Sequence, residues 1–224
     1  MDRKALLGRM IDCGVVGVIR TPTPETAQKA VEAVMAGGMS VVEITFTVPN
    51  AADLLRRLAH SIGSDVLLGA GTVTDAEKAK AAIDAGARFV VAPNTDPDTI
   101  RTAAALGAVA VPGALTPTEV VSAMHSGAYA VKIFPISVFG PSYLKALRGP
   151  LPDAILMPTG GIEVEDLYDY FAAGAAMVGV GGTLVEPRLV AAGDYDAITE
   201  RARRFIEAVR EARARLASEK RRGT

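Results

Sequence analysis

Short apolar runs alternate with helical patterns along almost the entire chain, from residue 14 to residue 217. This alternation constrains the fold more than any single motif, because each run followed by a helix forms one unit of a parallel sheet. The eight strand candidates are Val15–Ile19, Val41–Phe46, Val66–Gly71, Phe89–Ala92, Val109–Val111, Ala130–Phe134, Ala154–Met157 and Met177–Val180. They are nearly continuous in apolar residues, which is typical of parallel strands covered on both faces.

Several helical stretches end in a turn of small residues that leads directly into the next strand. Each turn contains a glycine, which takes the left-handed conformation of a helix C-terminus at no steric cost. These glycines stand at positions 38, 86, 107, 127 and 174, spaced by about 20 residues or about twice that, the length of one strand-and-helix unit. Eight units predict an α/β fold, a closed TIM (β/α)8 barrel. The alternative is an open doubly wound sheet of about five or six strands, which leaves the seventh and eighth runs without a place.

The length of the chain fits a single barrel domain over residues 1–224. An N-terminal helix is expected at about residues 2–12, and a basic C-terminal helix at about residues 194–217. Residues 201–222 carry nine Arg or Lys against three acids, with apolar residues at helical spacing. This pattern favours a solvated amphipathic helix over a tail that binds nucleic acid.

Charge and cysteine content narrow the class of partner. The formal net charge is −1 at pH 7, so no general electrostatic attraction to nucleic acid or to anionic lipid is expected. No run approaches the roughly 18 apolar residues of a membrane span. Cys13 is the only cysteine, which excludes an internal disulfide and favours the cytoplasm. The default expectation is therefore chemistry on a small molecule.

Lys132 stands out because it is the only one of seven lysines that falls in a strand candidate. Side chains alternate across a strand, so Lys132 points into the barrel if Val131 and Ile133 face the helices. Desolvation there lowers the pKa of the ammonium and supplies a neutral amine that can attack a ketone. The alternative is a buried lysine paired with a carboxylate for packing alone.

Glu43 lies in the strand candidate VVEITFT, in the set of alternating residues that is predicted to face inward. A carboxylate in a barrel interior is suited to proton transfer, although it could serve only as an ion-pair partner. His60 and His125 both lie in helical stretches, and no cluster has the spacing of metal ligands. We therefore expect a carboxylate base, with Glu43 and Lys132 acting as one unit and with no metal.

Glycine turns follow the last two strand candidates, in PTGGI at 158–162 and GVGGTLV at 179–185. Backbone amides at these two strand ends are a recurring phosphate site in barrels of this type, although either turn alone could be a plain loop. The residues expected to hold the anion are Gly160, Gly161, Gly181, Gly182 and Thr183. Arg20 ends the first strand and could clamp a carboxylate or phosphate, or pair with Glu43, while Thr72 could donate a hydroxyl to the same anion.

Taken in order, the motifs VVEITFTVPNA, GAGTV, VAPN, VPGALTPTE, VKIFP, PTGGI and GVGGTLV resemble those of the 2-keto-3-deoxy-6-phosphogluconate (KDPG) and 4-hydroxy-2-oxoglutarate (KHG) aldolases. The resemblance covers nearly the whole chain. It implies a (β/α)8 barrel that assembles as a homotrimer and uses no cofactor or metal. It also implies that Lys132 forms the imine, that Glu43 is the general acid and base, and that the glycine turns bind phosphate.

Positions 47 and 159 differ among family members, and the residues found there affect which groups are expected to bind the substrate. Some members carry an arginine where this chain has Thr47, so Arg20 is expected to take over the substrate carboxylate. Thr159 resembles the members that cleave the gluconate rather than the galactonate substrate. The substrate-binding set is then Arg20, Thr47, Thr72, Pro93, Phe134 and Thr159.

The expected reaction is cleavage of 2-dehydro-3-deoxy-6-phosphogluconate to pyruvate and glyceraldehyde 3-phosphate, with cleavage of 4-hydroxy-2-oxoglutarate to pyruvate and glyoxylate as a second activity. One alternative is a pyruvate aldolase for an unphosphorylated or galactonate-type sugar acid. Another is a phosphate-binding barrel of a different reaction class, such as an isomerase or a thiamin-phosphate-type synthase. A non-catalytic module that binds sugar phosphates is the remaining alternative.

Overall fold

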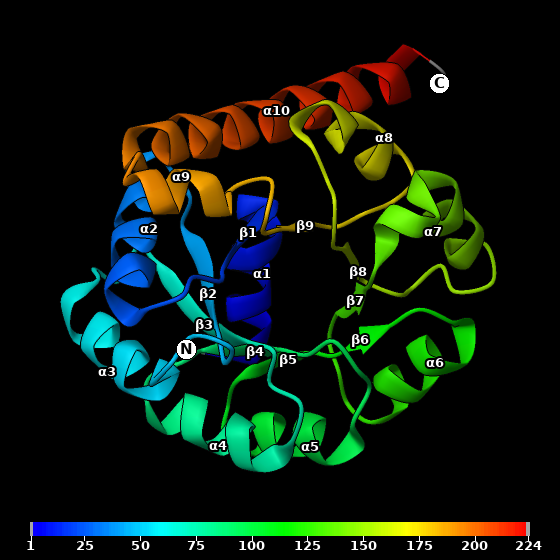
Figure 1. The fold of residues 1–224 in the computed structure, drawn as a ribbon. Coiled ribbons are helices and arrows are strands. Elements are labelled where there is room, and N and C mark those ends of the chain that lie inside the picture. The colour runs from blue at the N-terminus through cyan, green and yellow to red at the C-terminus, as the bar shows by residue number, and fades with distance from the viewer. Residues whose placement is uncertain (1, 223–224) are drawn as a thin grey trace.

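The computed structural model describes residues 2–222. Parallel strands curl around the centre of the molecule, and helices form a ring outside them (Figure 1). The elements in chain order are α1 (Arg3–Cys13), β1 (Val15–Ile19), α2 (Pro24–Ala36), β2 (Val41–Thr45), α3 (Ala51–Ser61), β3 (Leu67–Gly71), α4 (Ala76–Asp84), β4 (Phe89–Val91), α5 (Pro97–Ala105), β5 (Val109–Val111), β6 (Gly113–Ala114), α6 (Pro117–His125), β7 (Val131–Ile133), η1 (Ile136–Val138), α7 (Gly140–Arg148), β8 (Leu156–Pro158), η2 (Val164–Asp166), α8 (Leu167–Ala172), β9 (Val178–Val180), α9 (Pro187–Ala192) and α10 (Tyr195–Arg222).

The strands form two parallel sheets. The larger has the order β5-β4-β3-β2-β1-β9, and the smaller has the order β6-β7-β8. Neighbours in the larger sheet follow one another along the chain, and the last strand lies beside the first. This order contradicts the doubly wound alternative, in which the strand order reverses in the middle of the sheet.

The expected ladder of eight strands is interrupted at two places. Between β5 and β6 the chain passes through Pro112, which has no backbone N–H to donate to a ladder. As a result β5 pairs with β4, while β6 pairs with β7. Between β8 and β9 a single bridge, Thr159 to Gly179, joins the two sheets. The structure is thus an α/β fold with curled parallel sheets, and most of its strands other than β1 and β5 are shorter than the sequence predicts.

The strands separate two layers of apolar side chains. Val16, Val41, Leu67, Phe89 and Val109 belong to an inner cluster, which α1 completes with apolar residues of its own. A larger outer cluster lies between the strands and the surrounding helices and includes residues that alternate with the inner ones along each strand. Because both faces of the strands are apolar, a charged residue on the inner face is exceptional.

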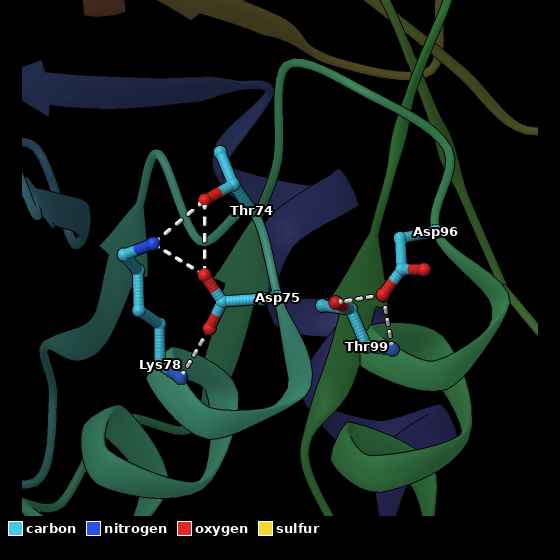
Figure 2. Close-up of polar contacts among 5 residues, drawn as sticks. All are labelled: Thr74, Asp75, Lys78, Asp96 and Thr99. Atoms are coloured by element: carbon cyan, nitrogen blue, oxygen red, sulfur yellow. Dashed lines mark hydrogen bonds and ion pairs between the residues drawn. The ribbon is translucent and has the colours of Figure 1, made fainter.

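Aspartate side chains fix the starts of two neighbouring helices (Figure 2). Asp75 accepts a hydrogen bond from the backbone N–H of Lys78 at the start of α4, and its carboxylate also pairs with the Lys78 ammonium. Asp96 accepts from the backbone N–H of Thr99 at 2.8 Å at the start of α5, and the Thr99 hydroxyl donates to the same carboxylate oxygen. These caps satisfy helix N–H groups that have no partner within the helix.

The terminal helices agree with the sequence-based expectations in type. Helix α1 spans Arg3–Cys13, and α10 extends to Arg222, beyond the expected end at about residue 217. In Figure 1, α10 runs along one side of the molecule, where it packs against α2, α8 and α9. Within residues 2–222, none of the helices combines the length and the apolar composition needed to cross a membrane.

Candidate active site

Lys132 lies at the centre of β7 and is 8% exposed. Its neighbours Val131 and Ile133 belong to the outer cluster, so the lysine side chain points to the inner face, as alternation predicts. Its Nζ lies 4.6 Å from the centroid of the Phe134 ring. Burial lowers the pKa of the Lys132 ammonium, the nearby charge of Glu43 opposes this shift, and the charge of Arg20 adds to it. At a given pH a larger fraction of Lys132 is therefore in the neutral amine form than for an exposed lysine.

Glu43 lies in the middle of β2 and is 1% exposed. Its Oε2 atom is buried and has no hydrogen-bond partner within residues 2–222. Burial raises the pKa of this carboxyl to about 7, while the positive charges of Lys132 and Arg20 act in the opposite direction. A carboxyl with such a pKa can both give and accept a proton near neutral pH.

Lys132 and Glu43 influence each other without forming an ion pair. No contact within 4 Å joins their charged atoms in the described part of the chain, although each shifts the pKa of the other. Burial is the largest cause of both shifts and pushes both groups toward their neutral forms. This separation argues against a lysine and a glutamate that are paired for packing alone.

A cavity of about 230 Å³ opens above Lys132. Among the residues predicted for the site, it is lined by Arg20, Lys132, Phe134, Thr159, Gly160, Gly161, Gly181 and Gly182. It therefore brings together the lysine, the arginine that ends the first strand and both glycine turns. Arg20 is exposed and is placed to meet an anion that enters from solvent.

The two glycine turns that line this cavity carry unpaired backbone donors. The N–H groups of Gly160, Gly161, Gly182 and Thr183 donate to no acceptor within residues 2–222. Gly160 and Gly161 have φ values of 104° and 67°, a conformation that favours glycine. Unpaired N–H groups of turns that line one cavity can bind an anion such as a phosphate.

The other predicted residues, Glu43 among them, lie outside the lining of this cavity. Thr47 is exposed, and its hydroxyl is 2.8 Å from that of Thr45. Pro93 is exposed on the loop after β4. Thr72 is half-buried and has a φ of 57°, which is strained for a β-branched residue and is typical of functional sites. Thr183 donates its hydroxyl to the carbonyl of Ile162 at 2.7 Å, so this hydroxyl points away from the cavity.

The structure also adds residues that the sequence did not single out. Val18, Val185 and Pro187 line the same cavity. Gly71, at the end of β3, leaves room for the Glu43 carboxylate. The motif GAGTV contains this glycine, but only the pairing of β2 with β3 places it beside Glu43.

An α/β fold that buries a lysine amine at a cavity lined by two glycine turns, with a buried carboxyl whose charge reaches that amine, fits an enzyme that acts on small molecules. Residues 8–201 match the model of the family described as KDPG and KHG aldolase. The chain belongs to this family. It is an aldolase, a carbon–carbon lyase.

Known relatives include enzymes for both epimeric substrates. The 2-dehydro-3-deoxy-6-phosphogalactonate aldolase of Escherichia coli (strain K12) is 35% identical over 88% of this chain and 95% of its own length. The 2-dehydro-3-deoxy-phosphogluconate aldolase of Pseudomonas aeruginosa is 36% identical over 79% of this chain and 80% of its own. A KDPG aldolase from Legionella pneumophila, solved with pyruvate captured as a covalent carbinolamine, has a TM-score of 0.81 and 28% identity, covering 91% of this chain and 97% of that one.

Proposed function

We propose that this chain cleaves 2-dehydro-3-deoxy-6-phosphogluconate to pyruvate and glyceraldehyde 3-phosphate through an imine on Lys132. The observation that carries the proposal is the placement of Lys132, a buried strand lysine with a lowered pKa, in the lining of a cavity that two glycine turns also line. A buried lysine of this kind is the usual nucleophile for a ketone.

In the proposed mechanism the Lys132 amine attacks C2 of the keto acid to form a carbinolamine. Glu43, protonated near neutral pH, donates a proton as water leaves and the iminium forms. Glu43 then accepts the proton of the C4 hydroxyl as the C3–C4 bond breaks. The electron pair of that bond moves to the iminium and leaves an enamine, and the aldehyde departs. Protonation of C3 and hydrolysis release pyruvate and restore the free amine.

The two ends of the substrate would be held by different groups. The unpaired N–H groups of Gly160, Gly161 and Gly182 support a phosphate site at the two glycine turns. Arg20 lines the same cavity and would bind the carboxylate in place of the arginine that some family members carry at the position of Thr47. Thr72 would donate its hydroxyl to the same carboxylate, and its strained backbone supports this role.

The gluconate substrate is proposed over its galactonate epimer because of Thr159. This residue is 5% exposed, lines the cavity and directly precedes Gly160 of the first glycine turn. The galactonate enzyme remains the second candidate, because identity to the two kinds of relative is nearly equal at 35% and 36%. Cleavage of 4-hydroxy-2-oxoglutarate is proposed as a weaker activity, since that substrate has no phosphate for the turns to bind.

Borohydride reduction in the presence of pyruvate tests the imine. We expect a stable adduct on the peptide that contains Lys132, detected by mass spectrometry, and no adduct in Lys132→Met. The peptide that contains Lys78 is the control and should carry no adduct, since Lys78 is partly exposed and paired with Asp75. An adduct elsewhere, or none, would refute the mechanism. Chelators should leave the cleavage rate unchanged, because the iminium and not a metal accepts the electron pair.

A comparison of four substrates tests the specificity. The kcat/KM should be highest for 2-dehydro-3-deoxy-6-phosphogluconate and should then fall in the order 2-dehydro-3-deoxy-6-phosphogalactonate, unphosphorylated 2-dehydro-3-deoxygluconate and 4-hydroxy-2-oxoglutarate. A reversed order of the first two would assign the chain to the galactonate enzymes. No preference for the phosphorylated acid would remove the phosphate site from the proposal.

The proposal extends to the complete architecture and assembly. We infer a single domain in which both sheets belong to one (β/α)8 barrel, and the bridge between Thr159 and Gly179 supports this closure. A cytoplasmic homotrimer is proposed from the family resemblance. The exposed side chains of Val138 and Phe139 support burial of part of the surface between subunits. Light scattering on the purified protein would measure the number of subunits.

A further inference from the structure

The turn that follows β9, residues 181–185, contacts two cavities. The cavity above Lys132 contacts Gly181 and Gly182. A second cavity, of about 560 Å³, contacts Gly182 and Thr183 and is otherwise lined mainly by charged residues within or directly before η2, α9 and α10. The charged groups of this second cavity are therefore placed to act on the turn.

The turn is short and rich in glycine, and its internal bonds leave two donors free. The N–H groups of Leu184 and Val185 both donate to the carbonyl of Gly181, at 2.9 and 2.8 Å. The N–H groups of Gly182 and Thr183 donate to no acceptor within residues 2–222. Adjacent glycines have high conformational freedom, so these two N–H groups would point in many directions if nothing outside the turn held it.

Arg201 of α10 contacts the turn and the residue directly after it. Its Nη1 donates to the carbonyl of Thr183 at 2.8 Å, and its Nη2 lies 2.6 Å from Oε2 of Glu186. Both side chains are half-buried, at 28% and 27% exposure. A planar guanidinium that bonds two acceptors fixes their relative position more firmly than an ammonium can. Arg201 thereby orients the Thr183–Leu184 peptide, and the free N–H of Thr183 lies on the peptide directly before it.

A second bond links this turn to the other glycine turn. The Thr183 hydroxyl donates to the carbonyl of Ile162, the residue directly after Gly161. A contact that fixes the position of Thr183 therefore also affects the distance between the two turns. Arg201 in turn is carried by a long helix that packs against α2, α8 and α9 (Figure 1).

We propose that Arg201 is a positioning residue for the phosphate group of the substrate. Through Thr183 and Glu186 it fixes the direction of the free N–H groups on the turn, without itself contacting the substrate. This inference rests on the proposed phosphate site. Preorganised donors bind an anion more tightly than mobile ones, because the cost of ordering them is met during folding.

Steady-state kinetics of Arg201→Met test the inference with a phosphorylated and an unphosphorylated substrate. The KM for the phosphorylated acid should rise roughly tenfold, the effect expected when a preorganised set of donors is loosened. The kcat, the KM for the unphosphorylated acid and the borohydride trapping of pyruvate should stay close to wild type. This split distinguishes a role at the phosphate from a general loss of structure.

Two further variants separate position from charge. Arg204 lies on the same helix and lines the same cavity, but it pairs with Glu165 at 3.1 Å and does not contact the turn. Arg204→Met removes the same charge and should leave the KM for the phosphorylated acid unchanged. Arg201→Lys keeps the charge but cannot hold both acceptors in one plane, so its KM should be intermediate. Melting temperatures within a few degrees of wild type would establish that all three variants fold.

The outcomes distinguish this inference from the proposed function. If the wild type shows no preference for the phosphorylated acid, the phosphate site itself is wrong. If the wild type shows the preference and Arg201→Met retains it unchanged, Arg201 has no positioning role. Equal effects of Arg201→Met and Arg204→Met, or wild-type behaviour of Arg201→Lys, would assign the effect to charge and would also overturn the inference.

Discussion

The carboxylate of Glu43 occupies the space that a side chain at Gly71 would need. A Cβ atom on Gly71 would overlap Oε1 of Glu43 and would approach Cγ2 of Thr45 to 3.2 Å. The two residues come from adjacent strands, in which Thr45 is the partner of Gly71 in the ladder. The absence of a side chain on β3 therefore determines where the carboxylate on β2 can lie.

Gly71→Ala should consequently displace the Glu43 carboxylate and slow catalysis. We expect kcat to fall by about tenfold to a hundredfold, because proton transfer is sensitive to displacements of about 1 Å. Borohydride trapping of pyruvate at Lys132 should persist. Gly8→Ala on α1 is a control, since a Cβ atom there meets nothing within 4 Å, and its kcat should match wild type. Unchanged turnover in Gly71→Ala would show that the position of Glu43 is unimportant.

The raised pKa of Glu43 predicts how stability depends on pH. The pKa rises from 4.5 to about 7 on folding, so between these values the folded protein keeps a proton that the unfolded chain releases. The stabilisation is fully present below pH 4.5 and is lost as pH rises through about 7, with a total change of roughly 3 kcal/mol. Urea unfolding of wild type and Glu43→Gln between pH 4.5 and 7.5 measures this change. As pH rises, the free energy of unfolding of Glu43→Gln should increase relative to that of wild type. A difference that stays constant with pH would contradict the prediction.

The charges around Lys132 predict the direction in which its pKa moves in two variants. Glu43 raises the pKa of Lys132 and Arg20 lowers it, against a background lowered by burial. Glu43→Gln should therefore lower the pKa further, and Arg20→Met should raise it. An NMR titration with labelled lysine side chains, assigned with Lys132→Met, measures these shifts. A pKa shift of the opposite sign in either variant would show that the removed charge does not influence Lys132 as predicted.

Most of the strands could be predicted because short apolar runs that alternate with helical patterns are typical of buried parallel strands. The first strand has the expected bounds, Val15–Ile19, and the fifth has the bounds Val109–Val111. Alternation placed Glu43 and Lys132 on the inner face, since it depends only on the strand period. The five turn glycines all have positive φ values, as their place between helix and strand predicts.

Features that depend on contacts between distant segments could not be predicted. The two-residue strand Gly113–Ala114 has no apolar pattern and exists only because β7 lies beside it. Thr183 was expected to offer its hydroxyl to the phosphate, but Ile162 accepts that hydroxyl instead. Arg201 lies in a basic helix whose pattern indicates a solvated face, and only the packing of α10 brings it to the turn after β9.

Loss of the cap at the start of α5 should lower stability without affecting catalysis. Asp96 accepts from the backbone N–H and the hydroxyl of Thr99, a residue that is 3% exposed (Figure 2). Asp96→Ala leaves both buried donors without this partner and should lower the free energy of unfolding by about 1–2 kcal/mol. Asp98→Ala removes a carboxylate from the same helix turn, but its partner Arg101 and Asp98 itself are mostly exposed, so about 0.5 kcal/mol or less is expected. Urea unfolding measures both values, and equal losses in the two variants would show that the cap contributes no more than surface charge.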